Sequence, residues 1–179
     1  MSAHDDASAR MPADPGEAPA GLLQGRFEGR LAFQQAVRDG LAAAAREGWR
    51  ELVLSDATFE DWPLGERETE GQLQAWAQGG RRLVLLARHY DEVGRRHARF
   101  VAWRRQWDHV IEARACRSAD PLGLPSAFWS PAWCLHRLDP ERSTGVAGSE
   151  PQRRLALREQ LDAWLRKSAP AFPASTLGL

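Results

Sequence analysis

Two short apolar runs most strongly constrain how this 179-residue chain can fold. Residues 51–55 read Glu-Leu-Val-Leu-Ser, residues 82–87 read Arg-Leu-Val-Leu-Leu-Ala, and each follows a stretch with helical periodicity. Strands that are apolar on both faces need cover on both sides, which is typical of parallel strands joined by helices. The sequence therefore predicts an α/β domain whose mixed, mainly parallel sheet is flanked by helices.

Helical and extended segments alternate along the rest of the chain. Apolar spacing and turn residues predict helices over 30–48, 64–78, 91–107 and 151–167, and strands over 51–55, 82–87, 109–115, 127–138 and 145–147. In the third helix, Phe100, Trp103 and Trp107 fall on one arc, which favours a core-facing ridge. Ser149 is placed to cap the last helix.

The two ends differ in composition from the middle of the chain. Residues 1–26 are rich in Ala, Pro, Gly and acids, so we expect a disordered tail there, a domain over 27–168 and a flexible tail over 169–179. The start lacks the pattern of a signal peptide and no run is long enough to span a membrane, so a cytoplasmic protein is expected. The 24 basic and 24 acidic residues give no overall field that would attract nucleic acid.

Several kinds of chemistry are disfavoured by residue usage. Lys167 is the single lysine, and its place near the end of the last helix makes Schiff-base or phosphate-gripping lysine chemistry an unattractive hypothesis. Cys116 and Cys134 lack the spacing of a metal site and are interpreted as buried thiols. We expect no cofactor and no metal.

Three segments taken together resemble one half of the phospholipase D fold: Leu-Val-Leu-Ser-Asp-x-x-Phe from residue 52, Trp-Ala-Gln-Gly-Gly from residue 76, and the strand over 82–87. The resemblance covers about residues 30–167. Within the family, the chain is similar to degenerate phospholipase D-like domains of bacteria. It implies a later strand with a His-x-Lys-(x)4-Asp motif and a Gly-Ser segment, to which Asp139 and Gly148-Ser149 correspond. It also implies that single-motif chains pair, so a homodimer is expected.

The same resemblance implies that the family's catalytic site is lost. With Asp139 as the motif aspartate, Ala132 stands where the nucleophilic histidine belongs and Cys134 where the phosphate-binding lysine belongs. Alanine offers no nucleophile, and hydrolysis of a phosphodiester needs one together with a proton donor. We therefore favour a chain that is not an enzyme.

Polar residues that follow the predicted strands form a candidate ligand-binding set, because ligands of open α/β sheets bind beyond the carboxyl ends of strands. The set is Asp56, Arg88, His89, His136, Asp139 and Ser149. Arginine with imidazole suits a phosphate or carboxylate. In the structural alternative, which we favour, Asp56 caps a loop, the histidines make ordinary hydrogen bonds, and Arg137 or Arg88 pairs with Asp139.

An arginine-rich stretch, residues 81–117, offers a second route to a partner. Arg95, Arg99 and Arg105 lie within it and are candidates to contact nucleic-acid phosphates. The predicted function is a non-catalytic phospholipase D-like module that binds a phosphorylated ligand, a nucleic acid or a protein partner. The alternative is a divergent phosphodiesterase or nuclease-like hydrolase that uses His89 and His136, which requires the two imidazoles to face each other.

Overall fold

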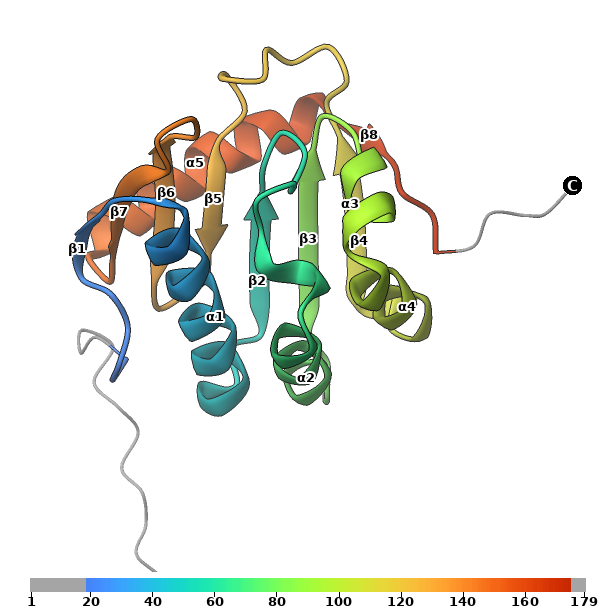
Figure 1. Cartoon of the computed structure of the whole chain (residues 1–179), viewed down its shortest axis with the longest axis horizontal. Helices are drawn as coiled ribbons and strands as arrows, with labels where there is room; N and C mark the ends of the chain where they lie inside the picture. Colours follow the sequence, from blue (N-terminus) through green and yellow to red (C-terminus); the bar gives the residue numbers. More distant parts are fainter. Residues whose placement is uncertain (1–18, 175–179) are drawn as a thin grey trace, which may run out of the picture.

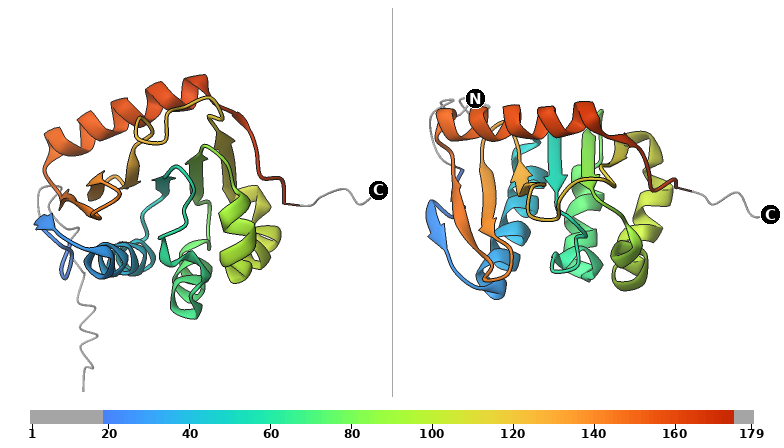
Figure 2. Two further views of the ribbon diagram at one scale, coloured as in Figure 1. Left: turned by 45° about the horizontal axis from the view of Figure 1, so that its top comes forward. Right: turned by 90° about the horizontal axis from the view of Figure 1, so that it is seen from above.

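The computed structural model describes residues 19–174 as three layers, with one sheet between two layers of helices (Figure 1). The strands are β1 (Gly25–Phe27), β2 (Glu51–Ser55), β3 (Arg82–Ala87), β4 (Ile111–Ala115), β5 (Ser126–Trp129), β6 (Cys134–Asp139), β7 (Thr144–Gly148) and β8 (Ala169–Pro170). The helices are α1 (Arg30–Glu47), α2 (Arg67–Trp76), α3 (Asp91–Arg96), α4 (Ala98–Gln106) and α5 (Pro151–Lys167), with short 3-10 turns η1 (Pro63–Gly65) and η2 (Asp108–Val110). Helix α5 covers one face of the sheet and the other four helices cover the opposite face (Figure 2).

The sheet is mixed, as predicted, but it is mostly antiparallel rather than mainly parallel. Its order within the described residues is β1-β7-β6-β5-β2-β3-β4-β8, and only the β2–β3 and β3–β4 pairings are parallel. Parallel pairing of neighbouring strands requires a crossover, and helical crossovers join β2 to β3 and β3 to β4. Tight turns join β5 to β6 and β6 to β7, and a tight turn reverses the chain.

The run over 127–138, predicted as a single strand, is in fact the β5–β6 hairpin. The break falls at Ser130 and Pro131, because proline has no N–H for the ladder. The Ser130 hydroxyl accepts a hydrogen bond from the Trp133 N–H (3.0 Å), and the Ser130 N–H donates to the Trp133 carbonyl (2.9 Å). The side chain of Ser130 thus closes the turn that the periodicity of the run did not reveal.

The helix predicted over 91–107 is divided into α3 and α4 at His97. The backbone of His97 leaves helical geometry at φ −119° and ψ 51°, and its buried ring places Nε2 2.8 Å from the Phe59 carbonyl oxygen. Phe100 and Trp103 are nevertheless buried, as the predicted core-facing ridge requires, whereas Trp107 is only partly buried.

Two apolar clusters hold the layers together, one on each face of the sheet. The larger lies under α1, α2 and α4, where Trp62 makes edge-to-face contacts with Phe33 and Phe59 at centroid distances of 5.4 and 5.1 Å. The smaller cluster joins Leu157 and Leu161 of α5 to the other face. Burial of both faces explains why residues 52–54 of β2 and 83–87 of β3 are all apolar.

The contacts of the domain extend beyond residues 27–168 at both ends. Leu22 is buried, and β1 pairs with β7. At the other end β8 pairs with β4, and Phe172 stacks on Tyr90 at a centroid distance of 4.8 Å. The rest of the two predicted tails, residues 1–18 and 175–179, lies outside the described residues. No helix of the described range, 19–174, combines the length and apolar character that crossing a membrane requires.

Candidate functional site

One edge of the sheet gathers most of the residues expected to form a site. Strands β2, β3, β4 and β6 run in the same direction, so their carboxyl ends meet at the upper edge in Figure 1. Asp56 follows β2, Arg88 and His89 follow β3, and Asp139 ends β6. These four of the six candidate positions therefore lie at one edge of the sheet.

Asp56 and Arg137 form a buried ion pair below this edge. Their side chains are 7% and 3% exposed, and Arg137 Nη2 lies 2.9 Å from Asp56 Oδ1. The other carboxylate oxygen, Oδ2, accepts the N–H groups of Thr58 (3.1 Å) and Phe59 (2.9 Å). The guanidinium of Arg137 stacks 4.2 Å from the ring centroid of Phe33. Asp56 therefore caps its loop, as the structural alternative stated, and Arg137 pairs with Asp56 rather than with Asp139.

The later candidate residues lie apart from one another, in or just after the β6–β7 hairpin: Asp139, Ser149 and His136. The Asp139 carboxylate accepts the Arg142 N–H (3.0 Å) and closes the β6–β7 turn. Ser149 lies past the end of β7, at the opposite edge, and hydrogen-bonds Gln24 through its hydroxyl and its N–H. The N-cap of α5 is Glu150, so the prediction that Ser149 caps this helix is wrong. These residues do not join Asp56 and Arg88 in one site.

The two histidines of the hydrolase hypothesis do not face each other. His136 shares a face of β6 with Cys134, which packs in the α5-side cluster, and burial there lowers its pKa. Two strands, β5 and β2, separate β6 from β3, which places the two strands roughly 14 Å apart. The cavity that His89 lines does not include His136. The geometry that the hydrolase requires is therefore absent from the described residues.

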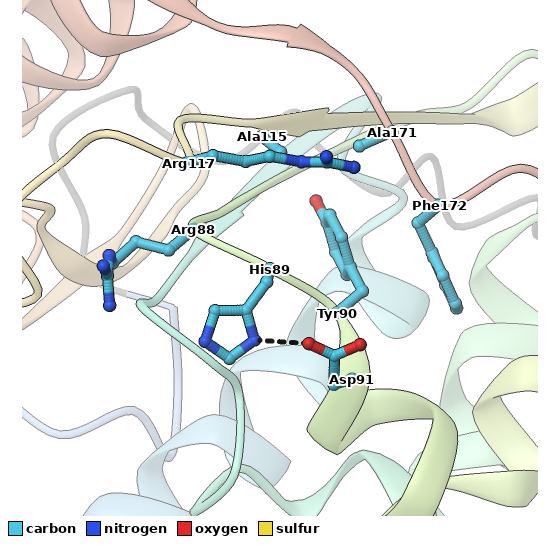
Figure 3. Close-up of a pocket in the computed structure, with 8 residues that line it drawn as sticks. All are labelled: Arg88, His89, Tyr90, Asp91, Ala115, Arg117, Ala171 and Phe172. Carbon is cyan, nitrogen blue, oxygen red and sulfur yellow. Dashed lines mark ion pairs between the residues drawn. The ribbon is translucent and has the colours of Figure 1, made fainter.

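Arg88 and His89 do line a cavity of about 540 Å³, here called the Arg88–Arg117 pocket (Figure 3). Its other lining residues are Tyr90, Asp91, Ala115, Arg117, Ala171 and Phe172. Figure 3 shows the Arg117 side chain crossing over Tyr90 and the Arg88 guanidinium reaching out on the far side of His89. The two cations therefore flank the pocket from different directions, and a volume of this size suits a small-molecule ligand.

Several polar groups of this pocket lack a hydrogen-bond or ion-pair partner. Arg88 Nε is buried without a hydrogen-bond partner, and no carboxylate of the described residues pairs with Arg88 or Arg117. His89 Nδ1 lies 3.1 Å from Asp91 Oδ2, but the two groups are not oriented to form a hydrogen bond. A buried N–H of a cation without an acceptor is unfavourable, and an anion in the pocket would supply one.

The remaining wall of the pocket is aromatic. Burial raises the pKa of the Tyr90 hydroxyl well above its usual range, and this neutral hydroxyl donates to the Arg114 carbonyl (2.8 Å). Phe172 stacks parallel to the Tyr90 ring, with 9° between the planes. The pocket thus combines cations with an apolar aromatic wall, an arrangement that suits a ligand with both a charged group and a ring.

Neither a cysteine thiolate nor a cluster of metal ligands occurs at this edge of the described residues. Burial raises the pKa of the Cys116 thiol and raises that of Cys134 to about 11, so both sulfurs are protonated near neutral pH. No cluster of three or more His, Cys, Asp or Glu residues within 19–174 could hold a metal ion.

The arginines proposed to contact nucleic acid are exposed and partly engaged with acids. Arg95 Nη1 lies 2.8 Å from Glu92, and Arg99 Nε lies 3.9 Å from Glu70. Arg105 is exposed and has no ion pair within the described part of the chain. Since Phe100 and Trp103 between them are buried, this surface presents no stacking platform from those rings.

Arg117, Tyr90 and Phe172 belong to the pocket but were not identified from the sequence. Arg117 comes two residues after β4, so the rule that drew attention to Arg88 after β3 applies to it equally. Phe172 lies in a segment expected to be a flexible tail, and no local pattern signals that it returns to Tyr90.

Comparisons with known proteins bear on the fold alone. No protein-family model and no curated protein matches the chain. Among solved structures, the fold is similar to that of TrmBL2, described as an archaeal chromatin protein that shows a novel mode of DNA binding, with a TM-score of 0.60 and 14% sequence identity. The match covers 82% of this chain and 53% of TrmBL2, so the chain spans about half the length of that neighbour.

Proposed function

We propose that this chain is a non-catalytic module that binds a phosphate-containing ligand in the Arg88–Arg117 pocket. The observation that carries the proposal is that Arg88, a residue of the pocket lining, has no carboxylate partner and has a buried Nε without an acceptor within the described residues. Arginine presents a planar set of N–H donors that matches the oxygens of phosphate. A bound phosphate would supply the acceptor that Arg88 lacks.

The treatment of other arginines supports this choice of pocket. Arg38 is held by Glu66 at 2.7 Å, and Arg82 is held by Glu51 and Glu112. Arg88 and Arg117, like Arg105 and Arg142, have no carboxylate partner among the described residues, but they are two such cations that line one pocket. Asp91 lies in the same pocket and approaches His89 instead. Two uncompensated cations at one pocket favour an anionic ligand.

The non-catalytic part of the proposal rests on the residues at the start of β6. On the resemblance to phospholipase D halves, Ala132 and the neutral thiol of Cys134 replace the histidine and lysine of the motif. His89 has no second imidazole in its pocket to complete a nucleophile and acid pair. The proposed kinship therefore supplies a scaffold without its hydrolytic chemistry.

Phosphate can come from a small phosphorylated molecule or from a nucleic acid, and the fold of a DNA-binding neighbour is compatible with the second source. Isothermal titration with adenosine monophosphate, and separately with a single-stranded oligonucleotide, distinguishes the two. The pocket has the size of a small-ligand site, so saturable binding of the mononucleotide is expected. Affinity should fall as salt rises from about 50 to about 200 mM.

Two variants locate the site. Arg88→Gln and Arg117→Gln should each weaken mononucleotide binding by about tenfold or more, since a charge-assisted hydrogen bond contributes roughly 1.5–3 kcal/mol. Arg166→Gln removes the same charge from an exposed position of α5 and should leave the affinity unchanged. Binding that survives both pocket variants, or the absence of saturable binding by either probe, would overturn the proposal.

A further inference from the structure

A second basic depression lies beside β1 and the β6–β7 turn, next to the first turn of α5. It has a volume of about 770 Å³ and is called here the β1–β7 groove. Arg26 of β1, Arg142 of the β6–β7 turn and Arg153 of α5 line it, together with Leu138 and Val146. None of its lining residues belongs to the Arg88–Arg117 pocket.

The strand register sets the direction of Arg26. Arg26 pairs with Val146, and Val146 pairs with His136, so the three side chains share one face of the sheet. Phe27, the next residue, is buried in the cluster under α1, on the opposite face. Arg26 must therefore project over the groove, and a one-residue shift of β1 would instead turn it toward the core.

The charges of the groove are strongly biased to one sign. Three arginines line it against one acid, Glu28. Arg153 is held by Glu150 at 2.8 Å, whereas Arg26 and Arg142 have no carboxylate partner among the described residues. The chain as a whole has no net charge, so this local excess is not a consequence of its composition.

The groove also exposes apolar surface between its cations. The Leu138 side chain is 63% exposed, and Val146 beside it is partly exposed. Repeated phosphates match the cations, because a positively charged groove tracks the backbone of a single strand. The aliphatic surface between the cations can contact a sugar or a base. An acidic peptide would match the cations but would leave the apolar floor in water.

We propose that the β1–β7 groove binds the sugar-phosphate backbone of a single-stranded nucleic acid, with Arg26 and Arg142 on phosphates and Leu138 against a base or sugar. This site is independent of the Arg88–Arg117 pocket. A chain whose pocket binds no mononucleotide could still bind a strand here, and the converse also holds.

The test uses fluorescence anisotropy of the full chain with a labelled single-stranded oligonucleotide of about 12 nucleotides, within the range of known site sizes. Arg26→Gln/Arg142→Gln should weaken binding by tenfold or more and reduce the slope of log affinity against log salt by about 1.4, because two phosphate contacts are lost. Leu138→Ser should weaken binding without changing that slope. Arg166→Gln, which removes one positive charge from an exposed position of α5, is the control and should change neither quantity.

Three results would overturn the inference: equal affinity of the double variant and the natural chain, an equal loss in the Arg166→Gln control, or equally tight binding of a polyglutamate peptide of matched charge. Titration with adenosine monophosphate separates the two proposals. The double variant should retain mononucleotide affinity, whereas Arg88→Gln should lose it. Circular dichroism of each variant shows whether the fold is intact.

Discussion

At the scale of single residues, the molecule separates charges that hold the fold from charges that remain free. Asp56 and Arg137 were both visible in the sequence, but their pairing was not, because 81 positions separate them. Both are buried and fully engaged, so they fix β6 against the loop after β2. Arg88 has the same charge and lies at the same edge, yet its Nε has no acceptor in the described structure.

Removing one member of the buried pair should be strongly destabilising. Arg137→Ala leaves the Asp56 carboxylate buried beside an apolar gap, and loss of one partner of a buried ion pair costs about 3–5 kcal/mol. Urea unfolding measures the change in free energy. The control is Arg30→Ala, which removes an arginine that is 65% exposed and paired with Asp61, and its effect should be at most about 1 kcal/mol. Equal losses would show that burial is not what makes Arg137 important.

A buried histidine gives the stability of the fold a pH dependence. Burial lowers the pKa of His97 below its ordinary value of 6.5. At a pH below that ordinary value, the unfolded chain binds a proton at His97 that the folded chain does not bind. The contribution of His97 to the free energy of unfolding is therefore fully present above that pH and decreases as the pH falls below it. Unfolding free energies measured downward from about pH 7 should decline less steeply in His97→Gln than in the natural chain. An unchanged slope in His97→Gln would refute this role.

At the scale of elements, local pattern predicted the parts of the fold that depend on local sequence. The apolar runs at β2 and β3 and the helical spacing of α1 and α5 were correctly identified. The predictions failed where one long-range contact divides a periodic run, as His97 does between α3 and α4 by reaching the Phe59 carbonyl. Strands β1 and β8 were missed because they are three and two residues long.

Substitution of Gly145 measures how tightly β7 packs between β1 and β6. A methyl group there would collide with the His136 carbonyl oxygen, and it would lie 2.6 Å from Phe27 Cζ, so backbone would have to move. Gly145→Ala should therefore lower the free energy of unfolding by about 1–3 kcal/mol, as overpacking does. Gly71→Ala, at an open position in α2, should instead raise it by about 0.5–1 kcal/mol. Thermal unfolding followed by circular dichroism compares the two, and a neutral Gly145→Ala would show that β7 is loosely packed.

At the scale of the whole molecule, sheet topology decides which candidate residues meet. The sequence correctly placed Asp56, Arg88 and His89 at strand ends, because a strand end is a local feature. It could not show that β5 and β2 lie between His136 and His89, since strand order depends on pairings between distant segments. The pocket was likewise incomplete without Phe172, which the β4–β8 pairing brings back to Tyr90.

The most direct measurement is an NMR titration of the ¹⁵N-labelled chain with adenosine monophosphate, because it locates binding as well as detecting it. Binding in the Arg88–Arg117 pocket predicts saturable shifts at the amides of residues 88–91 and 115–117 and at the Arg88 Nε–H, with the amides of α4 around Arg105 unmoved. The contrary result is a set of weak, unsaturable shifts spread over exposed arginines such as Arg105 and Arg166. That outcome would show only diffuse attraction between charges, and the pocket would not be a phosphate site.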